Sequence, residues 1–129
     1  MTQTQKTKIL IVEDDAFLAG IYSSKFDKEG FEVLMAGDGE AGLKMAQSKH
    51  PDIMLLDILL PKLDGFEVLE KIKASEATCD IPVIMLTNLV QKEDVDKGIK
   101  LGAVDYLIKA HFIPSETVEK VRKVLQNKK

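Results

Sequence analysis

The segment "PDIMLLDILLPKLDG", residues 51–65, places a single carboxylate, Asp57, between two apolar stretches at 53–56 and 58–60. Burying an unpaired carboxylate is costly, and a sequence that does so usually gives the group a partner or a chemical task. We therefore take Asp57 as the residue around which the function of this protein is organised.

Four further short apolar runs accompany the one that ends at Asp57. Most are apolar at successive positions without a clean alternation, which is typical of strands buried on both faces. They occupy residues 8–13, 31–36, 82–87 and 105–109. Segments with helical spacing of apolar residues follow each run. Five alternating strand and helix segments predict a doubly wound α/β fold, with a parallel sheet between two layers of helices.

Polar residues mark the expected helix starts. Asp38 and Asp64 are predicted N-caps of the second and third helices, and Ser115 is the predicted N-cap of the fifth. No linker, repeat or low-complexity tract interrupts the pattern. We expect a flexible N-terminal tail over residues 1–7 and one domain over residues 8–129.

The composition is that of a globular protein, with 45% hydrophobic and 30% charged residues among 129. Because the net charge is −3 and nucleic-acid binders are more often basic, we expect no nucleic acid as a partner. The N-terminus has no apolar signal core, and no apolar run approaches the roughly 20 residues of a membrane helix. Cys79, the single cysteine, fits a reducing compartment. These features predict a cytoplasmic protein without membrane contact.

Polar residues also end four of the five predicted strands. In an open parallel sheet, ligands bind outside the carboxyl ends of the strands, so these residues converge if their strands are neighbours. They are Glu13, Asp14, Asp15, Asp57, Thr87, Asn88 and Lys109. A single such residue is more often a helix cap or a solvated side chain, and the prediction of a site therefore depends on the whole set.

The chemistry of this set points to phosphoryl groups. Carboxylates held together repel one another and either take up protons or hold a cation. An all-oxygen site completed by water suits Mg²⁺, with Mn²⁺ as the alternative. The amine of Lys109 and the hydroxyl of Thr87 can bind the oxygens of an anion, and Asp57 can act as the nucleophile that forms an aspartyl phosphate.

Four motifs then identify a family. They are "VEDD" at 12–15, "LLDILLPKLDG" at 55–65, "MLTN" at 85–88 and "DYLIK" at 105–109. With them in this order, the chain resembles the receiver domain of bacterial two-component response regulators, the CheY-like family, over essentially its whole length. The resemblance implies a flavodoxin-like sheet of five parallel strands in the order 2-1-3-4-5, with five helices.

The resemblance also implies the roles of the acidic residues. Asp57 would accept a phosphoryl group from the phosphohistidine of a histidine kinase or phosphotransfer protein, in a reaction that depends on magnesium. Asp14, Asp57 and the backbone carbonyl of Leu59 would ligate the Mg²⁺ ion. Glu13 would complete the pocket from the outer shell, through metal-bound water.

The remaining implied roles concern the phosphoryl group and the switch. Thr87, Lys109 and the backbone N–H of Asn88 would contact the phosphoryl oxygens. Movement of Thr87 and Lys109, coupled to the side chain of Tyr106, would shift the face made by the fourth helix, fifth strand and fifth helix, and so control a partner protein.

The chain departs from the family pattern around this site. Leu59 and Leu89 stand two residues beyond Asp57 and Thr87, where the family flanks the path of the hydrolytic water. Two leucines would exclude that water, which predicts slow loss of the phosphoryl group. The family usually has a cis Lys-Pro peptide after the fifth strand, whereas this chain has Lys109-Ala110. Because a cis bond before a non-proline residue costs about 2.5–4 kcal/mol, its isomer stays open.

We therefore expect a stand-alone, single-domain regulator, a monomer or a phosphorylation-linked dimer, with no catalysis beyond its own phosphorylation and dephosphorylation. One alternative is a degenerate receiver that only docks partners. Another is a flavodoxin-like binder of phosphate esters, but the first turn, "EDDAFLAG", presents acids and lacks a glycine-rich phosphate cradle.

Overall fold

The computed structural model describes residues 6–88, 92–109 and 113–127, and it contains five successive strand–helix units. The predicted strands are confirmed to within one residue at each end. The elements are β1 (Lys8–Val12), α1 (Ala16–Lys28), β2 (Glu32–Ala36), α2 (Gly39–Lys49), β3 (Ile53–Asp57), α3 (Gly65–Ala74), β4 (Val83–Thr87), α4 (Lys92–Lys100), β5 (Asp105–Ile108) and α5 (Pro114–Asn127).

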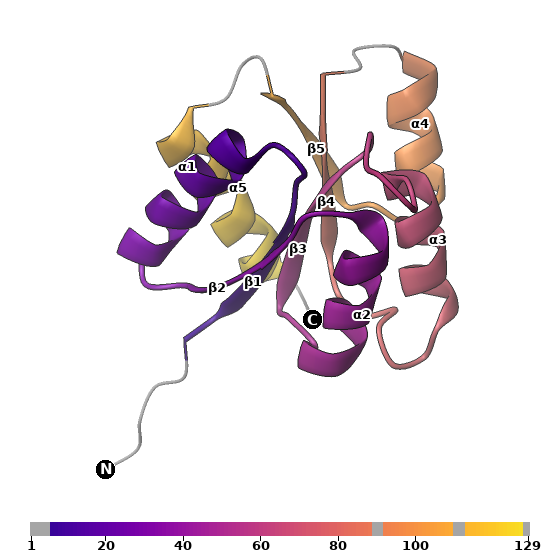
Figure 1. The fold of residues 1–129 in the computed structure, drawn as a ribbon, viewed down its shortest axis with the longest axis horizontal. Coiled ribbons are helices and arrows are strands. Elements are labelled where there is room, and N and C mark those ends of the chain that lie inside the picture. The colour runs from indigo at the N-terminus through magenta and orange to yellow at the C-terminus, as the bar shows by residue number, and fades with distance from the viewer. Residues whose placement is uncertain (1–5, 89–91, 110–112, 128–129) are drawn as a thin grey trace.

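The five strands form one parallel sheet in the order β2-β1-β3-β4-β5, as predicted. α1 and α5 lie on one face of this sheet, and α2, α3 and α4 lie on the other (Figure 1). This order places β1 beside β3, and β4 between β3 and β5. The ends of these four strands therefore meet at one edge of the sheet, in the upper part of Figure 1.

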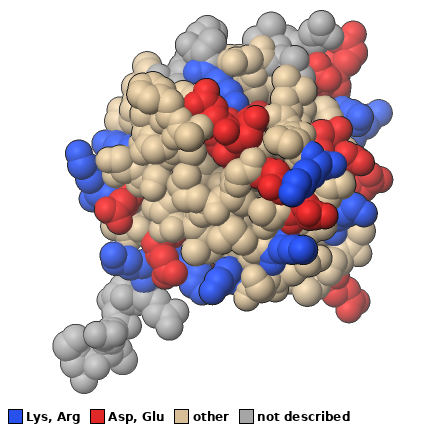
Figure 2. All heavy atoms as spheres, in the orientation of Figure 1, with Lys and Arg blue, Asp and Glu red and all other residues tan. Residues whose placement is uncertain are grey.

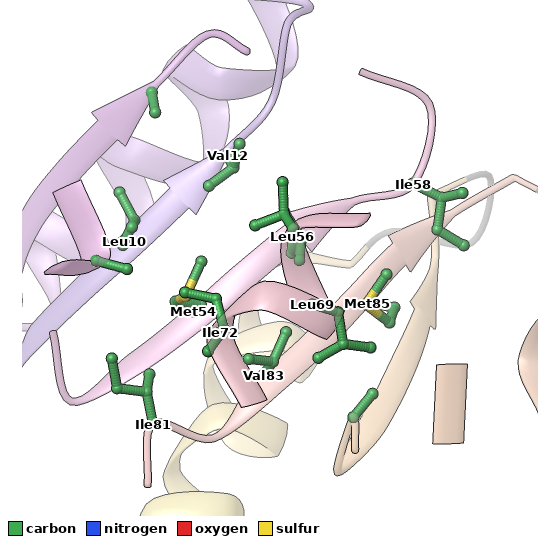
Figure 3. Close-up of a cluster of buried hydrophobic side chains, with 14 residues drawn as sticks. Leu10, Val12, Met54, Leu56, Ile58, Leu69, Ile72, Ile81, Val83 and Met85 are labelled. Carbon is green, nitrogen blue, oxygen red and sulfur yellow. The ribbon is translucent and has the colours of Figure 1, made fainter. Parts of the chain in front are cut away.

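The core consists of two layers, one on each face of the sheet. Leu10 and Val12 of β1 pack toward α2 and α3, whereas Ile9 and Ile11 pack toward α1 and α5. Figure 3 shows the first of these layers, in which side chains from neighbouring strands meet Ile72 of α3. Since successive residues are buried on opposite faces, the central strands are apolar without alternation. Burial of each such leucine or isoleucine side chain contributes roughly 1.5–3 kcal/mol to the free energy of folding.

Capping side chains start α2 and α3. Asp38 accepts a hydrogen bond from the backbone N–H of Ala41, and Asp64 forms a capping box with Glu67, as predicted. The prediction for Ser115 is wrong, because α5 already begins at Pro114. Proline has no N–H to satisfy and is favoured at the first helical position, so the helix starts before the serine.

The predicted tail of residues 1–7 lies outside the described residues except for Lys6 and Thr7. The carbonyl of Thr7 accepts a hydrogen bond of 2.9 Å from the backbone N–H of Glu32, at the start of β2. Among the described residues, no helix combines the length and the apolar character needed to cross a membrane.

Candidate functional site

The site lies where β1, β3, β4 and β5 end. Asp57 is the last residue of β3 and Thr87 the last residue of β4. Glu13 and Asp14 directly follow β1, and Lys109 directly follows β5. Glu13, Asp57 and Thr87 are 3%, 4% and 2% exposed, whereas Asp14 is exposed. The sheet order therefore assembles a largely buried polar group from residues that are far apart in the sequence, from Glu13 to Lys109.

Lys109 joins the two buried carboxylates. Its Nζ lies 2.8 Å from Oδ2 of Asp57 and 2.7 Å from Oε1 of Glu13. The contact with Asp57 agrees with the predicted convergence of the site, while the direct contact with Glu13 was not predicted. Charges removed from water are tolerated only when they are paired and hydrogen-bonded. This cation accordingly explains why the fold accepts Asp57 inside an apolar segment.

The protonation of these groups follows from their burial and their contacts. Burial raises the pKa of Glu13 above its ordinary value, although Lys109 acts against this shift. Burial by itself would lower the pKa of Lys109, but the hydrogen bonds to Asp57 and Glu13 outweigh it and raise the pKa. Lys109 is therefore a cation at neutral pH. Tyr22 of α1 is also buried, which raises its pKa to about 12 and keeps the phenol neutral.

An acidic cluster adjoins this ion pair. One carboxylate oxygen from each of Glu13, Asp14 and Asp57 lies within 4.8 Å of the others. Figure 2 shows acidic side chains gathered in the upper middle of the face, next to basic ones. Hard divalent cations such as Mg²⁺ prefer oxygen ligands and keep several waters. A set of carboxylates with one member open to solvent, Asp14, fits that preference.

The backbone around Asp57 depends on a close approach by Gly65. The N–H of Gly65 donates to the carbonyl of Ile58 at 2.7 Å, which closes the loop between β3 and α3. A Cβ atom at position 65 would lie 2.2 Å from the carbonyl oxygen of Asp57, so only glycine fits without a shift of the backbone. The spacing from Asp57 to Gly65 in the motif thus has a steric cause.

Asp15 supports the site without being part of it. Its side chain accepts hydrogen bonds from the N–H groups of Phe17 and Leu18 and so caps α1. Its own N–H donates to Oε2 of Glu13 at 3.1 Å, which helps to orient that carboxylate. The capping role is visible in the sequence as an aspartate before a helical segment, but the bond to Glu13 is not.

The other predicted site residues within the described part of the chain are exposed, unlike the buried groups of the ion pair. Leu59 is 66% exposed two residues after β3, and Asn88 is exposed directly after β4. Tyr106, the second residue of β5, is 37% exposed. Leu89 and Ala110 lie outside the described residues, and with them the second predicted water-excluding leucine and the isomer of the Lys109-Ala110 peptide.

A family model described as the response regulator receiver domain matches residues 9–122. The chain belongs to this family. A CheY-like response regulator receiver domain protein of Methanospirillum hungatei has a similar structure, with a TM-score of 0.90 at 28% identity over 96% of this chain and 97% of that one. Receiver domains are the phosphorylation-activated switches of two-component signalling, and this assignment confirms the function class predicted from the motifs.

Two relatives are transcriptional regulators by name. The DNA-binding dual master transcriptional regulator RpaA of Synechocystis is 40% identical over 92% of this chain and 49% of that protein. The alkaline phosphatase synthesis transcriptional regulatory protein PhoP of Bacillus subtilis is 36% identical over 92% of this chain and 48% of that protein. The receiver domain thus spans about half the length of these curated relatives.

These relatives correct the expectation about partners. The prediction that nucleic acid is no partner is wrong as a statement about this group of proteins, because RpaA is named as DNA-binding. The net charge of −3 was counted over this chain alone. A charge summed over one domain carries no information about what the other half of a longer relative binds.

Proposed function

We propose that Asp57 is the phosphoacceptor of this receiver domain. A carboxylate oxygen of Asp57 attacks the phosphorus of a phosphohistidine, an O–P bond forms, and the P–N bond breaks. The electron pair of that bond stays on the imidazole nitrogen, which then takes up a proton. The observation that supports this assignment is the position of Asp57, buried at a strand end with Lys109 2.8 Å away and two further carboxylates beside it.

Lys109 and the acidic cluster have complementary roles in this proposal. Lys109 neutralises Asp57 in the resting state and is placed to contact a phosphoryl oxygen once the ester has formed. Asp14 and Asp57 would hold Mg²⁺ together with the carbonyl of Leu59, and Glu13 would act from the outer shell. When bound, Mg²⁺ (or Mn²⁺) supplies positive charge that offsets the charge on the transferring group.

The switch is proposed to act through the ends of β4 and β5. Thr87 and the backbone N–H of Asn88 contact the phosphoryl oxygens, and Tyr106 couples that contact to α4, β5 and α5. A ligand shifts such an equilibrium only through contacts that differ between the two states. The names of RpaA and PhoP favour the regulation of transcription as the output to test first. Beyond its own phosphorylation and dephosphorylation, we propose no catalytic activity.

Incubation with acetyl phosphate tests this function directly. Intact mass should show the gain of one phosphoryl group when Mg²⁺ is present and little or no gain when EDTA removes the metal, because the acidic cluster then lacks its neutralising charge. Circular dichroism of both samples controls for folding. A folded, magnesium-loaded protein that gains nothing would contradict the proposal and favour a receiver that only docks partners.

The exposed leucine at position 59 leads to a second expectation. Replacing Leu59 by asparagine offers the hydrolytic water a hydrogen-bonding partner, and the rate of phosphoryl loss should rise about tenfold, equivalent to ~1.4 kcal/mol from one hydrogen bond. The decay of the phosphorylated mass after removal of the donor measures this rate. Met35→Gln, an apolar-to-polar change at another exposed side chain, is the control. Equal decay rates in the Leu59→Asn protein and its parent would show that Leu59 plays no part in excluding water.

A further inference from the structure

α4 is held to the rest of the receiver domain by very little side-chain packing. Gly98 is the only buried residue among the nine of this helix, Lys92–Lys100, and it has no side chain. Ile99 is 47% exposed, and Val95 is half-buried. α3 on the same face buries three large side chains, Val68, Leu69 and Ile72. Since burial of apolar area is the main force that holds a helix to a sheet, α4 is the more weakly anchored of the two.

The glycine at position 98 is not required by a close approach. A Cβ atom built there would lie 3.5 Å from Cγ of Met85 and 3.8 Å from Cε1 of Phe66, which are ordinary van der Waals distances. By contrast, a Cβ atom at Gly39 or Gly65 would lie less than 3.0 Å from backbone atoms. Glycine inside a helix is unfavourable relative to alanine, so position 98 carries a destabilising residue where a better one would fit.

The space under α4 reaches the phosphoryl site. A cavity of about 10 Å³ beside Gly98 is also lined by Met85, Thr87 and Tyr106. Thr87 ends β4 next to Asp57's strand, and Tyr106 belongs to β5. The loosely packed side of α4 therefore faces Thr87 and Tyr106, the two residues that couple phosphorylation of Asp57 to the α4 surface in the proposed function.

We propose that Gly98 keeps α4 easy to displace. Little side-chain packing is then lost when binding of a phosphoryl group moves the helix from its resting position. This inference rests on the proposed function of the Asp57 site. A methyl group at position 98 would contact Met85 and Phe66 in the α4 position of this structure, and in the proposal these contacts are lost when α4 is displaced. It would therefore favour the resting arrangement and, because coupling between two sites is reciprocal, weaken the binding of a phosphoryl group by the same factor.

Equilibrium binding of beryllofluoride, a non-covalent mimic of a phosphoryl group, in the presence of Mg²⁺ tests the proposal. The three proteins to compare are the wild type, Gly98→Ala and Gly20→Ala. Gly20 lies in the interior of α1, and its Cβ atom would meet nothing within 4 Å, so this variant has the same gain in helix propensity without new packing. Hydrogen exchange of the α4 amides is measured on the same three proteins.

We expect Gly98→Ala to bind beryllofluoride roughly fourfold more weakly than the wild type, the factor for one methyl group packed in the resting state alone. Its α4 amides should also exchange more slowly, while Gly20→Ala binds like the wild type and leaves α4 exchange unchanged. Unchanged or tighter binding by Gly98→Ala, with binding by the wild type intact, would overturn the inference alone. A wild type that binds no beryllofluoride would overturn the proposed function, and the coupling with it.

Discussion

Asp57→Asn is expected to abolish phosphorylation by acetyl phosphate, while Asp15→Asn is expected to preserve it. The amide of asparagine has nearly the shape of the carboxylate but is a very weak nucleophile, so the O–P bond cannot form. The fold should tolerate the change, because Asp57 lies at the end of β3 and its packing is conserved in the amide. Intact mass after incubation with acetyl phosphate and Mg²⁺ measures the result.

Asp15→Asn is a matched control because it makes the same chemical change two residues from Glu13. Asparagine is as good an N-cap as aspartate, and α1 should keep its start. Gain of a phosphoryl group by the Asp57→Asn protein would place the acceptor elsewhere in the acidic cluster, with Asp14 as the next residue to replace. Loss in both variants, with both folded, would show that the net charge of the cluster matters more than one nucleophile.

Lys109→Met is expected to lower the free energy of unfolding by about 3 kcal/mol at neutral pH, because it leaves two buried carboxylates without their cation. Lys120→Met is the matched control. Lys120 pairs with Asp105 at 3.1 Å, but both side chains are about a third exposed, and such pairs contribute less than about 1 kcal/mol. Urea unfolding in EDTA measures both variants. Equal losses in the two would contradict a structural role for the buried cation.

The pH dependence of the Lys109 variant follows from the direction of the pKa shift. The pKa of Lys109 is raised in the folded protein above the ordinary pKa of a lysine, which applies in the unfolded chain. Its stabilisation is therefore complete below the unfolded pKa and is lost as the pH rises through the folded pKa. The difference in stability between the parent and Lys109→Met should therefore shrink in strongly alkaline solution. A difference that stays constant across that range would mean that lost packing of the lysine stem, and not its charge, causes the effect.

Much of the fold could be predicted because the apolar runs are short and their boundaries are chemically marked. Successive burial of Ile9, Leu10, Ile11 and Val12 on alternating faces is typical of a parallel strand that is covered on both faces. Aspartates at 38 and 64 mark two helix starts through their capping side chains. The prediction for the start of α5 is wrong because Ser115 fits the N-cap pattern, whereas Pro114 favours the first helical position and the helix begins there.

The candidate site could be predicted only as a set of residues. Parallel strands end at a common edge, and so the sequence predicts that Asp57 and Lys109 lie near one another. The contact of Lys109 with Glu13, the bond from the Asp15 N–H to Glu13, and the steric need for Gly65 all depend on distances between segments far apart in the chain. No local pattern encodes such distances.

In this receiver domain, some properties are determined by the residue order and others only by the tertiary structure. Residue order alone specifies the strands, the starts of α2 and α3, the acidic and basic residues at the strand ends, and the family, because each of these depends on neighbours in the chain. The fold specifies which carboxylate Lys109 neutralises, which glycines are sterically required, and that Gly98 is not among them. These properties depend on packing, and packing exists only after β1, β3, β4 and β5 have come together.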